Sequence, residues 1–208
     1  MFATGIFFNA KKSEKIHEEK LPEDTALAFR AADGDEAAFE QLVKKYERFV
    51  STCAYSVTEN AEDALDVSQE VFLKVYRSLP SFKGESSFST WLYRVAKNCA
   101  YDFARKKKPA SVSLDAEDED GNSMDLPDSD EKVSPEALAL KKERSELLWR
   151  AIGRLSDEHR EAITLRDING LTYEQIAEIT SLEVGTVKSR LFRAREALKK
   201  QLEKENYF

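Results

Sequence analysis

Apolar residues recur at intervals of three and four positions through most of the chain, which is the spacing of one helix face. In the first half this spacing joins Phe39, Leu42, Val43, Tyr46, Phe49 and Val50, and then Val67, Val71, Val75 and Leu79. Pro80 should end the second of these helices, because proline has no backbone N–H to donate. A third helix is expected to begin at Ser89 or Thr90, both favourable N-caps, and to run to Pro109.

The second half of the chain shows the same periodicity, divided by capping residues. Its first long helix should open near Pro135. The apolar face of that helix is marked by Leu138, Leu147, Leu148, Ile152 and Leu155. Ser156 should cap the next helix and Asn169-Gly170 should close it, while Thr172 caps "YEQIAEIT". No strand-like alternation of useful length is found, so we expect an all-α protein of two small helical domains.

The last helix separates an apolar stripe from a cationic face. At ~100° per residue, Val187, Leu191, Ala194 and Leu198 fall in one narrow arc. The opposite side carries Lys188, Ser189, Phe192, Arg193, Glu196, Lys199 and Lys200, with Arg190 and Arg195 at its flanks. Charge alone would equally suit a solvated surface. The short helix and tight turn that precede it favour a helix-turn-helix, whose outer face can enter a DNA major groove.

The net charge of −7 lies in one segment. Residues 109–136 hold ten acidic residues, one basic residue and three prolines, a composition typical of a solvated linker. Charges balance in residues 1–23 and 24–108, and residues 137–208 carry a small positive excess. We therefore expect domains at 24–108 and 137–208, a flexible acidic linker at 109–136, and a disordered extension at 1–23.

Composition argues against several classes of protein. No apolar run approaches the ~20 residues that span a membrane, and the apolar start lacks the features of a signal peptide. Two cysteines without a CxxC motif and two isolated histidines give little support for a disulfide or a metal site. The sequence contains no Gly-rich phosphate loop and no nucleophile–base arrangement. We expect no enzyme, no catalytic residues and no cofactor, and we expect a cytoplasmic protein.

The first domain carries opposite charges at two places. Glu59–Glu70 contains five acids and no base, which suits either a basic protein partner or an ordinary solvated helix start, and charge alone favours the latter. Trp91–Lys108 contains six bases and one acid, with Trp91, Tyr93, Tyr101 and Phe103 interleaved. Aromatic faces and cations together are typical of single-stranded DNA binding. The alternative is that some of these aromatics belong to the core.

Two long stretches resemble the extracytoplasmic-function branch of the bacterial sigma-70 superfamily. They are "DVSQEVFLKVYRSLPSFKGESSFSTWLYRVAKNCAYDFARKKK", similar to region 2, and "LTYEQIAEITSLEVGTVKSRLFRAREALKK", similar to region 4. The resemblance covers roughly 24–108 and 137–203. It departs at the turn, where Thr180-Ser181 replaces the usual Leu-Gly and Glu183 replaces the usual Ser cap. A slightly less stable turn is expected, because serine adopts this conformation less easily than glycine.

The resemblance implies a sigma factor that binds core RNA polymerase and directs promoter recognition, DNA melting and transcription initiation, in a stress or envelope response. It implies minus-35 contacts by Thr186, Lys188, Ser189, Arg190, Phe192 and Arg193. It implies minus-10 contacts and melting by Lys83, Ser87, Phe88, Trp91, Arg94, Lys97, Asn98 and Arg105. It implies core polymerase binding by Asp66, Gln69, Glu70 and Phe72. The implied partners are the β′ clamp helices, the β flap, promoter DNA and an anti-sigma factor, without membrane insertion.

Other functional classes make different predictions from the same residues. An ordinary helix-turn-helix regulator would bind duplex operators tightly as the free chain, whereas a sigma factor should bind promoters weakly until core polymerase is added. A helical interaction module would show no salt-dependent DNA binding, whereas phosphate contacts should give a steep salt dependence. A nucleic-acid enzyme is disfavoured because no catalytic arrangement is present.

Overall fold

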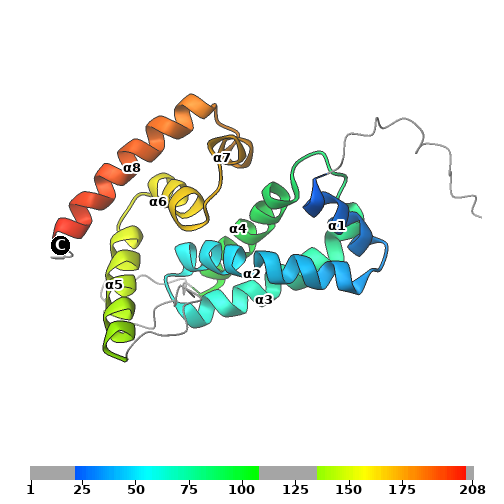
Figure 1. Ribbon diagram of the computed structural model, residues 1–208, viewed down its shortest axis with the longest axis horizontal. Coiled ribbons are helices and arrows are strands. Elements are labelled where there is room, and N and C mark those ends of the chain that lie inside the picture. Colours follow the sequence, from blue (N-terminus) through cyan, green and yellow to red (C-terminus); the bar gives the residue numbers. More distant parts are fainter. Residues whose placement is uncertain (1–21, 108–134, 205–208) are drawn as a thin grey trace, which may run out of the picture.

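The computed structural model describes residues 22–107 and 135–204, and every regular element within these ranges is helical (Figure 1). The N-terminal body, residues 22–107, contains α1 (Glu23–Ala32), α2 (Glu36–Thr58), α3 (Ala61–Ser78), the 3₁₀ turn η1 (Leu79–Ser81) and α4 (Phe88–Lys107). The C-terminal body, residues 135–204, contains α5 (Pro135–Gly153), α6 (Asp157–Ile163), the π-helical turn η2 (Thr164–Ile168), α7 (Tyr173–Thr180) and α8 (Val184–Lys204). The all-α prediction is confirmed. The predicted linker up to residue 134, and the predicted extension up to residue 21, lie outside the described residues.

Helix α2 organises the N-terminal body, because it packs against α1, α3 and α4. Figure 1 shows α2 and α3 lying side by side. The buried face of α3, which packs against α2 and α4, includes Val67, Val71 and Val75, each at most 1% exposed. Their spacing of four residues places them in one row along the helix. The periodicity seen in the sequence is therefore the buried seam of this bundle.

The C-terminal body holds the helix-turn-helix formed by α7 and α8. Val187, Leu191 and Ala194 are buried against the body, as the helical wheel predicted. Leu198 is half-buried, and Leu202 continues the buried row one turn further. Because the stripe is narrow, the opposite face of α8 stays exposed.

Helix caps agree with the sequence in part. Thr172 and Gln175 form a reciprocal capping box at the start of α7. Ser156 takes the N-cap position of α6, but its side chain makes no capping hydrogen bond. The start of α4 was predicted wrongly. Ser87 is the cap, since its hydroxyl accepts the Thr90 backbone N–H at 3.2 Å, and Thr90 itself is buried within the helix.

The turn of the helix-turn-helix contains a strained residue. Ser181 has a φ of 57°, in the left-handed region that glycine adopts without steric cost. Its backbone N–H bonds to the Ala177 carbonyl and closes α7. The sequence departure from Leu-Gly therefore falls on the one residue of this turn that most favours glycine.

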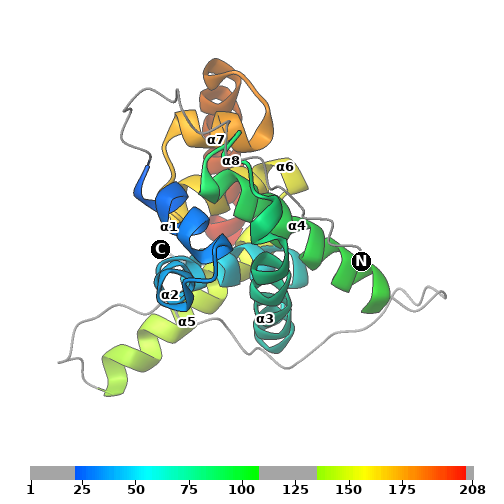
Figure 2. The ribbon, with the colours of Figure 1, turned by 90° about the vertical axis from the view of Figure 1, so that its right-hand side faces the viewer.

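The two bodies pack against each other, which the sequence did not predict. Helix α4 contacts α7, and α2 contacts η2. Figures 1 and 2 both place α6 and α7 beside α4. A single cluster of buried apolar residues continues from one body into the other, and the rings of Tyr55 and Trp149 meet at 4.8 Å between centroids.

Ser181→Gly should raise the free energy of unfolding by up to about 1 kcal/mol. Glycine removes the steric cost of holding a side chain in the left-handed region, ~1–2 kcal/mol. This gain is partly offset by the ~0.5–1 kcal/mol of extra chain entropy that glycine loses on folding. Urea unfolding followed by circular dichroism measures the change.

Thr180→Gly is the matched control one residue earlier. It lies inside α7 and its hydroxyl bonds to the Ile176 carbonyl at 2.7 Å. Glycine there should lower the free energy of unfolding by about 1 kcal/mol. If both substitutions destabilise the protein equally, the strain assigned to Ser181 is absent.

Candidate nucleic-acid interface

The outward face of α8 consists of polar and cationic side chains around one exposed aromatic ring. Thr186, Lys188, Ser189, Phe192 and Arg193 are all exposed, and Phe192 is 68% exposed. The exposed Phe192 ring is available for an apolar contact with a ligand. Arginine and lysine can bind guanine edges and phosphates, and an apolar ring can contact a thymine methyl group. This combination of side chains suits a DNA major groove.

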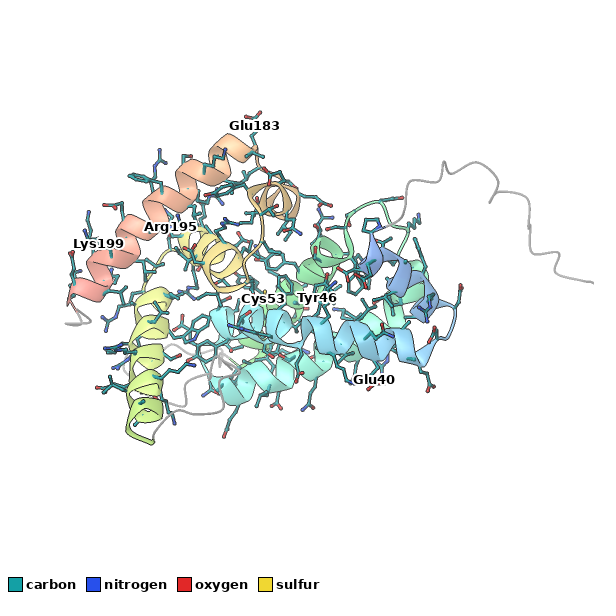
Figure 3. The ribbon with its side chains drawn as sticks, viewed as in Figure 1. Glu40, Tyr46, Cys53, Glu183, Arg195 and Lys199 are labelled. Atoms are coloured by element: carbon teal, nitrogen blue, oxygen red, sulfur yellow. The ribbon has the colours of Figure 1, made fainter. Side chains whose placement is uncertain are left out.

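The two flanking arginines of α8 are turned toward the protein. Arg190 lies 3.2 Å from the Glu158 carboxylate. The Arg195 guanidinium lies 2.5 Å from Asp167, and Figure 3 shows Arg195 on the side of α8 that faces α6. The hydrogen bond to Asp167 raises the pKa of Arg195 above its usual value. Arg190, expected among the DNA contacts, is therefore engaged with Glu158 here, whereas Arg193 points outward.

The second candidate surface lies on α4 and the loop before it. Lys83, Arg94, Asn98 and Arg105 are exposed, and Arg105 pairs with Asp102 one turn earlier. These side chains come from the loop that follows η1 and from successive turns of α4. They form a mostly cationic strip with a donor–acceptor amide among them.

The aromatic residues of this region serve mainly the core. Phe88 is only 2% exposed, with its ring 5.3 Å from Tyr46 and 5.9 Å from Phe82 between centroids. Packing at the first turn of α4 buries the Phe88 ring, so the predicted contact of Phe88 with DNA stays a prediction for which this structure offers no exposed surface. Trp91 is half-buried against Phe82 and Phe88. Tyr93 is 7% exposed, which confirms that some interleaved aromatics belong to the core.

Two of the predicted minus-10 residues are bonded to the C-terminal body. The Glu161 carboxylate accepts hydrogen bonds from Lys97 Nζ at 2.7 Å and from the Tyr93 hydroxyl at 2.6 Å. Burial, together with the nearby Cys53 and Glu161, raises the pKa of Tyr93 well above its usual value, so its phenol keeps its proton. The Ser87 backbone N–H donates to Glu178 at 2.9 Å. Among the predicted minus-10 residues, Lys97 and Ser87 are therefore bonded to the C-terminal body. The exposed ones are Lys83, Arg94, Asn98 and Arg105.

The outward face of α3 combines acids with apolar side chains. Asp66, Gln69 and Glu70 are exposed and Phe72 is half-buried. The sequence reasoning missed three exposed apolar neighbours on this helix, namely Leu65, Leu73 and Tyr76. A helical wheel of this segment would have revealed them, since residues 65, 69, 73 and 76 recur at steps of three and four opposite the buried valine row. Exposed apolar groups beside acids are typical of a protein-binding surface.

Two features are absent from the parts of the chain that the structure describes. Within residues 22–107 and 135–204, histidine, cysteine and acidic side chains nowhere gather in the groups of three that could hold a metal ion. No helix in these ranges is both long and apolar enough to cross a membrane. Cys53 and Cys99 are free and buried.

Comparison with known proteins matches both bodies to one family. Residues 42–109 match the model of sigma-70 region 2, and residues 145–198 match that of sigma-70 region 4. The chain is 41% identical over 181 residues to the ECF RNA polymerase sigma-E factor of Escherichia coli K12, covering 84% of this chain and 92% of that protein. It is 40% identical over 183 residues to the RNA polymerase sigma-H factor of Pseudomonas aeruginosa PAO1, covering 87% and 94%.

Two solved structures share the fold. One is CnrH in complex with the cytosolic domain of CnrY, with a TM-score of 0.63, 27% identity, and coverage of 86% of this chain and 97% of that one. The other is the sigma factor RpoE in complex with the anti-sigma factor NepR from Bartonella quintana, with a TM-score of 0.58, 25% identity, and coverage of 79% and 96%. The chain belongs to the extracytoplasmic-function family of sigma-70 factors, which bind RNA polymerase and direct it to promoters.

Proposed function

We propose that the outward face of α8 reads the minus-35 element as duplex DNA. The observation that carries this proposal is the free cationic face of α8, fixed in place by the buried Val187, Leu191 and Ala194. Arg193 and Lys188 are the cations for base edges and phosphates, and Phe192 is the apolar contact for a thymine methyl. Arg190 holds α8 to Glu158 and contributes less to reading bases.

The N-terminal body captures the minus-10 element after its bases unstack. Unstacking costs a few kcal/mol per base, so an opened base must be held as it forms. Lys83 and Ser87 stand in the loop before α4, while Arg94, Asn98 and Arg105 follow along α4 itself. Their charges suit a phosphate backbone, and the half-buried Trp91 offers the edge of an aromatic surface for stacking. Phe88 supports this surface from inside.

The α3 face binds the β′ clamp helices of core polymerase, and the C-terminal body binds the β flap. Asp66 and Glu70 attract a basic partner surface and increase the association rate. Leu65 and Leu73 supply the apolar contact that charge alone does not, since buried apolar anchors carry most of the energy of an interface.

Regulation is proposed by analogy with the relatives. The RpoE structure is that of a complex with an anti-sigma factor, and we infer that an anti-sigma factor also holds this chain until a stress or envelope signal releases it. The chain acts in the cytoplasm, where RNA polymerase works, and it acts as a specificity subunit without catalysing a reaction itself.

The test is run-off transcription of a genomic library by holoenzyme reconstituted from purified chain and core RNA polymerase. Transcripts should start at a limited set of promoters that share upstream and downstream elements. The free chain should bind the recovered promoters weakly, with affinity rising when core is added. Tight, specific duplex binding without core would instead indicate an ordinary helix-turn-helix regulator.

Arg193→Ala should relax or abolish selectivity for the minus-35 element, with a loss of about 1–3 kcal/mol in discrimination against a wrong base. Affinity for core polymerase should be unchanged, because Arg193 lies on α8, outside the α3 face to which clamp binding is assigned. Transcription from promoters with single substitutions in the upstream element measures the discrimination.

Arg195→Ala is the matched control, because it removes the same side chain two residues further along α8. Arg195 bonds to Asp167 rather than facing outward. It should therefore leave the ranking of upstream elements intact. Equal loss of selectivity in both variants would argue against a reading role specific to Arg193.

Leu73→Ala should weaken core polymerase binding about tenfold, as expected for an apolar interface anchor worth ~1.4 kcal/mol. Asp66→Lys with Glu70→Lys should weaken it further by reversing the charge. Leu140→Ala is the control, since Leu140 is a similarly exposed leucine on α5. Titration of fluorescently labelled chain with core polymerase measures all three, and unchanged affinity for the α3 variants would leave the clamp assignment without support.

A further inference from the structure

The loop between η1 and α4, residues 82–87, lies against helix α1, and we call it the pre-α4 loop. A methyl group on the Cα of Gly84, in the middle of this loop, would lie 3.0 Å from Cζ of Phe29 and 3.7 Å from Cγ2 of Thr25. Helix α1 also contacts η1 and α4. Figure 1 shows α1 at the end of the bundle where the chain turns from α3 into α4. The first helix of the body therefore supports the loop that leads into the proposed strand-capture surface.

Gly84 combines a left-handed backbone with this close approach. Its φ of 71° is one that glycine adopts without steric cost. Carbon atoms attract each other at about 3.5–4.0 Å, so a side chain at the 3.0 Å position would have to displace either the Phe29 ring or the loop. Two separate constraints therefore require glycine here, and one of them is the ring of Phe29.

The Phe29 ring also contacts Phe82, the first residue of the pre-α4 loop. The centroids of these two rings lie 5.7 Å apart. Phe82 is 6% exposed, and its ring lies 5.9 Å from Phe88 and 5.3 Å from Trp91 between centroids. Phe29 is thus joined through one buried ring to Trp91, the aromatic residue proposed to stack on an unstacked base.

Helix α1 is itself held to α2. The Asp24 carboxylate accepts hydrogen bonds from the Tyr46 hydroxyl at 2.8 Å and from Lys45 Nζ at 2.5 Å. Leu27 and Ala28 on the same helix are buried. A helix held by both polar and apolar contacts is a firm support, which accurate placement of a binding loop requires.

The outer side of the pre-α4 loop remains open to a ligand. Lys83, Gly84 and Glu85 are exposed, and Ser86 and Ser87 are half-buried. A site tells one base from another only when its donors and acceptors are placed to within ~0.5 Å, so the path of the loop decides which base fits. The sigma-70 region 2 model begins its match at residue 42, and α1 lies before that point.

We propose that Phe29 is a positioning residue for the pre-α4 loop, and that its contact with Gly84 determines how strictly the loop discriminates among unstacked minus-10 bases. This inference rests on the proposed strand-capture function of the N-terminal body. Phe29 acts through Gly84 and Phe82 without contacting DNA. A change in α1 then alters promoter selectivity while every DNA-contacting residue stays the same.

The first experiment shortens the support. Phe29→Leu removes the ring atom nearest to Gly84 and keeps an apolar side chain. Holoenzyme saturated with the variant transcribes templates made from one promoter of the genomic library, with each of the four bases placed in turn at each downstream-element position. The ratio of run-off transcript from the preferred base to that from the other bases should fall on the order of tenfold, about the effect of one mismatched base. Loss of folded protein lowers all templates alike and cancels in this ratio.

Phe39→Leu is the matched control, because it shortens another half-buried phenylalanine of the same body. The Phe39 ring packs on Tyr76 of α3, at 5.0 Å between centroids. This variant should keep the wild-type ratio at every downstream position. If Phe29→Leu and Phe39→Leu change the ratio equally, or if neither changes it, the proposal is wrong.

A double-substitution cycle tests the contact itself. Gly84→Ala adds the methyl group that meets Phe29, so it should also lower the ratio. Phe29→Leu removes the atom that this methyl meets, and the double variant should therefore discriminate better than Gly84→Ala alone. Contacting residues are expected to be non-additive in this way. Purely additive effects on the logarithm of the ratio would contradict the contact.

Gly170→Ala controls for the backbone strain of the Gly84 substitution. Gly170 has a φ of 70°, and among the described residues no atom other than those of its chain neighbours would lie within 4 Å of its added methyl. Gly170→Ala should leave the downstream ratio unchanged, alone or together with Phe29→Leu. A fall in the ratio equal to that of Gly84→Ala would assign the effect to strain and not to Phe29.

These outcomes are distinct from failure of the proposed function. Wild-type holoenzyme that transcribes all downstream variants equally would refute base capture by the N-terminal body. A wild type that discriminates, combined with Phe29 and Gly84 variants that discriminate equally well, would refute only the positioning role of Phe29.

Discussion

The arrangement of this protein depends on the hydrogen bonds that the Glu161 carboxylate accepts from Tyr93 and Lys97. One acid of α6 thereby binds two side chains, a phenol and an ammonium group, that lie one turn apart on the same face of α4. Because burial raises the pKa of Tyr93, the phenol remains a donor throughout the physiological range. The Tyr93 hydroxyl can therefore keep donating its proton to Glu161.

Helices α3 and α8 share one structural requirement. Each must bury enough apolar surface to be held firmly while leaving a different face free. Helix α8 meets this need with a stripe one residue wide at Val187, Leu191 and Ala194, and α3 meets it with its valine row. The free faces then differ in chemistry: cationic with one exposed phenylalanine on α8, and acidic with exposed leucines on α3. The same architecture thus supports a nucleic-acid surface and a protein surface.

The turn between α7 and α8 shows how local strain is tolerated. Ser181 sits in the left-handed region without the freedom of glycine. The capping box at Thr172 and the buried Ile176 and Ile179 stabilise α7 apart from the turn itself. The departure of this residue from the family pattern should therefore affect stability locally.

The sequence by itself determined the helical class and the buried stripe of α8, which follow from local periodicity that neighbouring residues fix among themselves. The glycine-favouring position in the turn came from comparison with the family pattern, and the division into two helical domains came from composition and charge. Sequence reasoning misplaced the cap of α4, because Ser87, Ser89 and Thr90 are all favourable caps and local chemistry does not choose among them. The contact of Phe88 with DNA came from the family resemblance, which does not show that packing buries this ring. Only the tertiary structure decided that Glu161 and Glu178 bind Lys97 and Ser87, since these residues lie more than sixty positions apart and their meeting depends on how the bodies pack.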